Sequence, residues 1–86
     1  MYDFTDTVTC SEVDGELVVL DAASGLYYGL DAIGARMVAV LQTSANLEEA
    51  AGTLAREYDA PVERLREDLH ALAKTLASKG LVRSGG

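Results

Sequence analysis

The side chains that could perform chemistry are few and scattered along this chain of 86 residues. His70 is the sole histidine and lies next to Leu69 on an amphipathic helix, where a solvated flank position is a more common role than general base. Cys10 is the sole cysteine and has no histidine near it in sequence, so a half-buried thiol is favoured over a nucleophile. These residues indicate a protein that is not an enzyme by itself.

The acidic pairs do not form a catalytic or metal-binding set either. Glu48-Glu49 and Glu67-Asp68 are adjacent on predicted helices, so the two carboxylates of each pair diverge instead of meeting at one substrate. One histidine and one cysteine are too few for a zinc site. We therefore expect neither a metal nor a cofactor.

The net charge of −7 comes from the first part of the chain. Residues 1–35 hold seven acids and no Lys or Arg, whereas residues 36–86 hold seven acids and seven bases. Nucleic-acid binding needs clustered Lys and Arg to replace counterions, so we expect no nucleic-acid partner. The acidic half either keeps the protein in solution or steers a basic peptide or enzyme towards it.

The length and composition predict one domain over residues 1–86. An apolar content of 49% and a charged content of 24% are typical of a globular protein. The chain has no apolar run near 18 residues and no export signal, so we expect no membrane association. A single cysteine cannot form an internal disulfide, which indicates the cytoplasm.

Local signals predict three strands followed by three helices, an α+β fold with the element content of a winged helix. Asp14-Gly15 predicts a tight hairpin turn, Asp31 is a candidate N-cap, and Pro61 suits the first position of a helix. Residues 1–4 are expected to be a loose terminus, and residues 83–86 a tail. The predicted strands are about 5–12, 16–21 and 25–30, and the predicted helices about 32–43, 46–58 and 61–79.

The third predicted strand is the most unusual stretch of the sequence. Its residues Leu26, Tyr28 and Leu30 share one face, and Tyr27 and Gly29 share the other. In a meander this strand lies at a sheet edge, where unpaired backbone groups can accept a peptide as an additional strand. The aromatic pair is equally compatible with ordinary core packing. The residues alone leave both interpretations open.

The order of these elements, with "SGLYYGLDAIGARMVAVL" in the middle and "LREDLHALAKTLASKGLV" near the end, resembles the PqqD-like family. These domains recognise peptides in pathways that modify ribosomally made precursors. The likeness covers roughly residues 5–83. The positions that carry it are Gly25, Tyr27, Tyr28, Leu30, Asp31, Ala35, Arg36, Leu69, Leu72, Gly80, Leu81 and Val82.

The resemblance implies that the chain binds the leader segment of a precursor peptide, added to the third strand beside the third helix. A free-standing acidic domain is most similar to the leader-binding protein of lasso-peptide pathways. The partners implied are the precursor leader peptide, a leader-cleaving cysteine protease and, further along, the macrolactam cyclase. The implied peptide-binding residues are Leu26, Tyr27, Tyr28, Gly29, Leu30, Val62, Leu65, Arg66, Leu69, His70 and Ala73. The choice of helix flank is open, because Glu63, Asp68 and Leu72 could equally face the peptide.

Two other functions remain open at this point. The same architecture could present a cofactor precursor to a radical enzyme, since the family includes such proteins. A DNA-binding winged helix is disfavoured because its predicted recognition helix, residues 46–58, carries one base, Arg56, against three acids.

Overall fold

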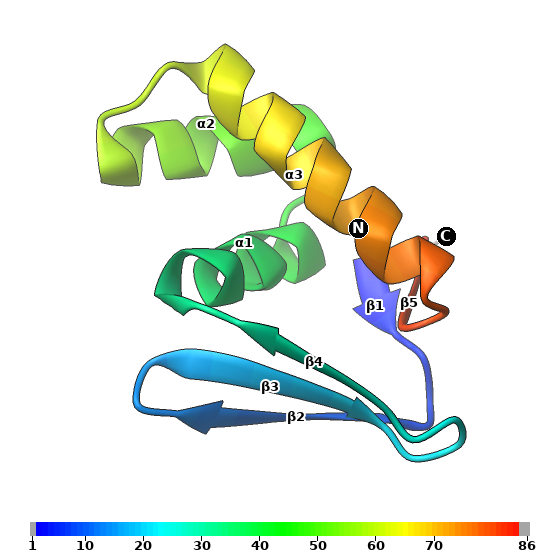
Figure 1. Ribbon diagram of the computed structural model, residues 1–86. Coiled ribbons are helices and arrows are strands. Elements are labelled where there is room, and N and C mark those ends of the chain that lie inside the picture. Colours follow the sequence, from blue (N-terminus) through cyan, green and yellow to red (C-terminus); the bar gives the residue numbers. More distant parts are fainter. Residues whose placement is uncertain (1, 85–86) are drawn as a thin grey trace.

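The computed structural model describes residues 2–84 and contains the predicted antiparallel three-stranded sheet. Its strands are β2 (Val8–Val13), β3 (Glu16–Asp21) and β4 (Leu26–Leu30), and β3 lies in the middle (Figure 1). The prediction that β4 is an edge strand is confirmed. The first strand of this sheet begins at Val8, because Asp6-Thr7 forms a turn and Thr5 bonds elsewhere, to the carbonyl of Leu81.

Both connections in the sheet follow from local turn chemistry. Asp14 and Gly15 both have positive φ angles, 53° and 81°, as a two-residue hairpin turn of the predicted kind requires. The β3–β4 turn is organised by Asp21, whose carboxylate accepts hydrogen bonds from the hydroxyls of Thr7 and Ser24. These bonds hold the pKa of Asp21 below its ordinary value.

Three helices follow the sheet: α1 (Ala32–Thr43), α2 (Leu47–Tyr58) and α3 (Val62–Ser78). The Asp31 side chain caps α1 by accepting a 2.8 Å hydrogen bond from the Gly34 amide, as predicted. Gly34 also lets α1 lie close to β4, since an added Cβ would be 3.0 Å from a methyl group of Leu30. Pro61 is the N-cap of α3 and not its first helical residue, so that prediction was wrong by one position.

The chain ends were predicted wrongly. Residues 2–4 form β1 (Tyr2–Phe4), which pairs with β5 (Val82–Ser84) in a separate two-stranded antiparallel sheet. The pairing brings Tyr2 opposite Ser84, so residues 2–4 and 83–84 belong to strands; residues 1, 85 and 86 lie outside the described part of the chain. Aromatic Tyr2 and Phe4 pack on the core, which explains why so short a pair of strands forms.

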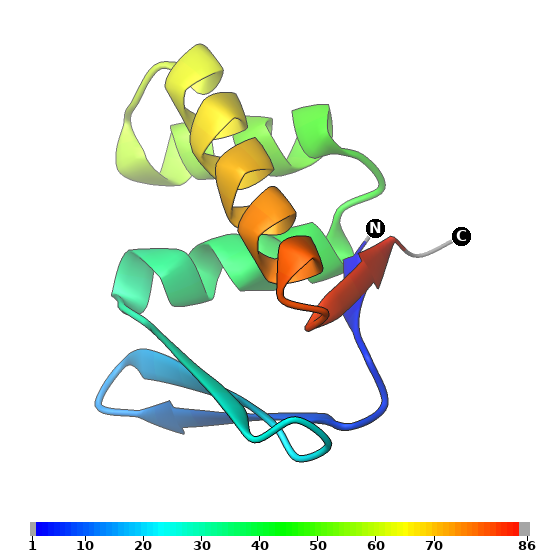
Figure 2. The same cartoon turned by 45° about the vertical axis from the view of Figure 1, so that its right-hand side comes forward.

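The molecule has two layers, with the β2-β3-β4 sheet on one side and the helices on the other (Figures 1 and 2). One cluster of buried residues joins the three helices, and a second joins the sheet to α1, α3 and β5. Leu72 of α3 packs against both clusters. The opposite face of the sheet is not covered by any described element (Figure 1).

Candidate functional site

The edge strand β4 presents two different rows of side chains. Leu26, Tyr28 and Leu30 are half-buried and pack against the cluster between sheet and helices. Tyr27 points the other way and is 65% exposed, and Gly29 is exposed beside it. Among the described residues β4 pairs only with β3, so the backbone groups along its other edge have no strand partner.

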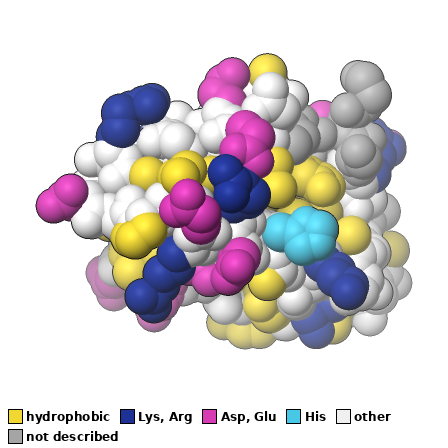
Figure 3. Space-filling model, turned by 90° about the horizontal axis from the view of Figure 1, so that it is seen from above, with side chains coloured by type: hydrophobic (Ala, Val, Ile, Leu, Met, Phe, Trp, Pro, Cys, Tyr) yellow, Lys and Arg dark blue, Asp and Glu magenta, His cyan; other side chains and the backbone are white. Residues whose placement is uncertain are grey.

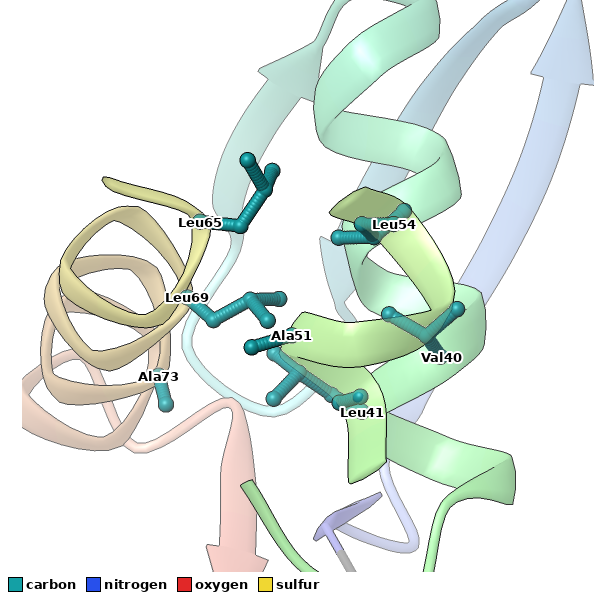
Figure 4. Packing of buried hydrophobic residues seen from close by; sticks show 8 residues of the cluster. Val40, Leu41, Ala51, Leu54, Leu65, Leu69 and Ala73 are labelled. Carbon is teal, nitrogen blue, oxygen red and sulfur yellow. The ribbon is translucent and has the colours of Figure 1, made fainter. Parts of the chain in front are cut away.

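Four of the predicted helix residues belong to the core that joins the three helices. Leu65, Leu69 and Ala73 are buried and point towards α1 and α2, where they meet side chains such as Leu54 (Figure 4). Val62 is half-buried against the same cluster. These residues support the position of α3 from within the core.

A different flank of α3 faces the sheet. The ammonium group of Lys79, the C-cap of α3, lies over the Tyr28 ring, 5.5 Å from its centroid. Leu72, seven residues earlier, packs against the same cluster as Tyr28. Asp68 and Thr75 complete a 4-3-4 stripe with these two residues, so the four lie on one side of the helix. We call Asp68, Leu72, Thr75 and Lys79 the β4-facing stripe.

Arg66 and His70 lie on the other flank. The Arg66 guanidinium forms two hydrogen bonds with the Glu48 carboxylate of α2, which lowers the pKa of Glu48 and raises that of Arg66. His70 follows Arg66 by four residues and is about 160° from Leu72 around the helix axis. The sole histidine accordingly appears on the surface seen from the helix side, away from the sheet (Figure 3). Of the three alternative residues, Leu72 and Asp68 lie on the side of α3 that contacts Tyr28 through Lys79, whereas Glu63 lies seven residues before His70 and so on the same side as His70.

Lys79 is the residue of this region that sequence reasoning missed. The sequence predicts it only as a cation near a helix C-terminus. Its contact with Tyr28 joins residues far apart in the chain, and no local pattern indicates such a pairing.

An open hollow of about 280 Å³ lies beside the uncovered face of the sheet. It is lined by Tyr27, Gly29, Leu30 and Asp31 on one side and by residues 16–18 on the other. Gly29 helps to create this space, because a Cβ built on it would have no atom within 4 Å. Backbone at this point of β4 is therefore open to close approach by another chain.

The titratable side chains and helices of the described residues add three observations. Cys10 is exposed, so the half-buried position expected from the sequence is wrong. Desolvation by neighbouring atoms still raises the pKa of its thiol, which disfavours the thiolate that a nucleophile would need. Within residues 2–84, no group of three or more His, Cys, Asp or Glu side chains could hold a metal ion. None of the helices in that part of the chain is long and apolar enough to cross a membrane.

Comparisons with known proteins agree with this geometry. The chain is similar to TbiB1, solved in complex with the TbiA(beta) leader peptide, with 30% identity, a TM-score of 0.84 and coverage of 96% of each chain. A lasso peptide synthetase B1, complexed with its leader peptide, shares the fold with a TM-score of 0.87 over 96% of this chain and 98% of the other, at 24% identity. The comparison with curated proteins found no match.

The sequence comparison extends over most of the chain. Residues 16–82, from the start of β3 to the beginning of β5, match the family described as coenzyme PQQ synthesis protein D (PqqD). The match includes β4 and the whole of α3, the two elements that meet at Tyr28 and Lys79. This chain therefore belongs to the PqqD family.

Proposed function

We propose that this protein binds the leader segment of a ribosomally made precursor peptide, of the lasso-peptide type, as an additional strand on β4. The observation that carries the proposal is the similarity to TbiB1, whose solved structure contains a leader peptide. The protein itself catalyses no reaction, and it acts in the cytoplasm, where its single cysteine stays reduced.

Strand addition uses the free edge of β4. A peptide backbone there satisfies N–H and C=O groups that otherwise bond to water, and its alternate side chains enter different surroundings. One row of the peptide lies next to Leu26, Tyr28 and Leu30, which face the helices. The other row lies next to Tyr27 and Gly29.

The helix side of the binding site is the β4-facing stripe. Leu72 supplies an apolar contact, and Thr75 supplies a hydroxyl. Asp68 and Lys79 place opposite charges at the two ends of the stripe, so a peptide whose charges follow the reverse order is preferred. In this assignment Leu65, Leu69 and Ala73 fix the helix from inside the core, and Arg66 and His70 make no peptide contact.

The partners follow from this role. A bound leader holds the adjoining cleavage site close to a leader-cleaving cysteine protease, and the same complex can deliver the peptide to the macrolactam cyclase. Tethering raises the effective concentration of the substrate to the order of mM when the connection is short and flexible. We propose that the protein works in this way, as a scaffold.

The test is a titration with a fluorescent leader peptide from the precursor that accompanies this protein, in variants N-methylated at one backbone nitrogen at a time. In a β-ladder alternate residues of an edge strand direct their N–H groups to the neighbour, so N-methylation should weaken binding at every second position across the bound segment. Sensitivity without a period of two, or no saturable binding at micromolar protein, would contradict strand addition.

The family description itself favours a second candidate, in which the peptide is a precursor of coenzyme PQQ presented to another enzyme. The two candidates share the β4 site and differ in the peptide. A parallel titration with a PQQ precursor peptide distinguishes them, since the cognate peptide binds more tightly.

A further inference from the structure

Lys79 carries a positive charge that no carboxylate of the described chain neutralises. The three ion pairs within residues 2–84 involve Arg36, Arg66 and Arg83. Lys79 is exposed and belongs to none of them, and its ammonium group lies 5.5 Å from the centroid of the Tyr28 ring. A ring face attracts an ammonium group less strongly than a carboxylate does, because the ring has no net charge. The charge of Lys79 is therefore available to a carboxylate from another molecule.

This charge lies over an acidic sheet. α3 descends towards the sheet, so that its C-terminal end is the end nearer to β4 (Figures 1 and 2). The segment that builds the sheet, residues 1–35, contains seven acids and no Lys or Arg. A peptide on the β4 edge thus meets no cation from the strands, and Lys79 brings a positive charge to Tyr28. An acidic side chain is favoured beside Tyr28 and repelled by the other charges of the sheet.

The geometry of strand addition fixes the position of that acidic side chain. A residue of the added strand directly opposite Tyr28 has its Cβ about 4.5–5.5 Å from that of Tyr28 and points to the same face, towards α3. The residues two positions before and after it lie opposite Leu26 and Leu30, which are half-buried and apolar. The helix-facing row of the peptide therefore meets apolar surface at both ends and the ammonium group of Lys79 between them.

We propose that Lys79 determines the specificity of the β4 edge, by exchanging the Tyr28 ring for a carboxylate on the leader residue opposite Tyr28. This inference rests on the proposed function and specifies the peptide: an acidic residue, with an apolar residue two positions away on each side. A leader with an apolar residue opposite Tyr28 would cover the ammonium group without giving it a partner. Burial of an unpaired charge is unfavourable, so such a leader is disfavoured.

The experiment titrates wild-type protein with the accompanying leader peptide and with variants in which one acidic residue at a time is replaced by its amide. We expect one replacement within the bound segment to weaken binding by about tenfold, in the range for loss of a hydrogen bond to a charged group. The same replacement should have no effect in Lys79→Met protein. The matched control is Lys74→Met, on another side of the same helix, which should respond like wild type.

Two further peptides test the register and the sign of the charge. Moving the acid by two residues keeps it on the helix-facing side but places it opposite Leu26 or Leu30, so the lost affinity should not return. Replacing the acid by lysine should abolish binding to wild type and restore it in Lys79→Glu protein. Recovery in this pair shows that both proteins are folded and that the two side chains meet.

A leader that binds with the same affinity after every acid-to-amide replacement would overturn the role of Lys79. Equal leader affinity in wild-type and Lys79→Met protein would do the same, and so would recovery after the acid is moved. In each of these results the leader still binds, so the proposed function stands. Absence of saturable leader binding to wild type contradicts the proposed function, and this inference with it.

Discussion

The ammonium group of Lys79 and the ring of Tyr28 are in contact, with 5.5 Å between the nitrogen and the ring centroid. The contact joins the C-terminal end of α3 to the edge strand β4. It also shows which flank of α3 is turned towards the strand, because Leu72 lies on the same side of the helix and packs into the same cluster as Tyr28.

The first prediction concerns this pair. A double-mutant cycle with Lys79→Met and Tyr28→Leu should give a coupling energy of about 0.5–1 kcal/mol in urea unfolding, the range for an exposed cation over an aromatic ring. Lys79→Arg should retain most of it, since a guanidinium also binds the ring face. Lys74→Met, on another side of the same helix, is the control and should show no coupling with Tyr28→Leu.

The second prediction distinguishes residues of α3 that stabilise the fold from residues that contact the leader peptide. Leu69 is completely buried, so Leu69→Ala should lower the free energy of unfolding by about 2–5 kcal/mol. Leu72 is half-buried, so Leu72→Ala should cost less stability but weaken leader binding more than any loss of folded protein explains. Unfolding curves and peptide titrations of both variants test this. Equal leader affinity in wild-type and Leu72→Ala protein would remove Leu72 from the site.

The third prediction uses two glycines with opposite conformations. Gly29 is in an extended strand with open space around it, so Gly29→Ala should stabilise the protein by about 0.4–1 kcal/mol by restricting the unfolded chain. Gly25 has a φ of 74°, so Gly25→Ala should destabilise it. Thermal unfolding distinguishes the two, and a lower melting temperature for Gly29→Ala would contradict the open space at that position.

The fourth prediction concerns how the stability of the fold depends on pH through Asp21. The pKa of Asp21 is lowered, chiefly by the Thr7 hydroxyl and then by Ser24. A lowered pKa in the folded state means that the stabilisation is present above the ordinary value of 3.8 and is lost as pH falls through the folded value. Asp21→Asn should therefore be less stable than wild type at neutral pH, and the difference should shrink below about pH 4. Urea unfolding at several pH values measures it.

Glu48 and Glu57 also have lowered pKa values, through Arg66 and Arg36, so wild-type and Asp21→Asn protein will both lose stability in acid. The difference between the two isolates Asp21. A constant difference from pH 7 to about pH 3 would contradict the assignment.

Much of the fold was predictable because its signals are local. Asp14-Gly15 sets the first turn, Asp31 caps α1, and the spacing of Leu65, Leu69, Leu72 and Leu76 identifies the buried side of α3. The β1–β5 pair was missed because its strands are three residues each and the partners are at opposite ends of the chain. A short strand has no recognisable pattern until its partner is known.

The candidate site was predictable in the strand and less so in the helix. The alternation of Leu26, Tyr28 and Leu30 with Tyr27 and Gly29 already assigned the two faces of β4. On α3 the apolar stripe indicates only which side is buried. Which of its flanks turns to β4 depends on how α3 crosses the sheet, and that angle is set by packing against α1 and α2.

The acidic charge of the sheet also matters while the chain is being synthesised. The three strands and their turns emerge from the ribosome before any part of α2 or α3, so the nascent chain has free strand edges and an apolar sheet face before it has most of its helical layer. β1 remains unpaired for longest, because its partner strand β5 is synthesised after all three helices. Sheets of neighbouring nascent chains could pair through these edges. Residues 1–35 contain seven acids and no Lys or Arg, so the sheets of neighbouring nascent chains repel one another. The same charges therefore protect the protein from aggregation during its synthesis.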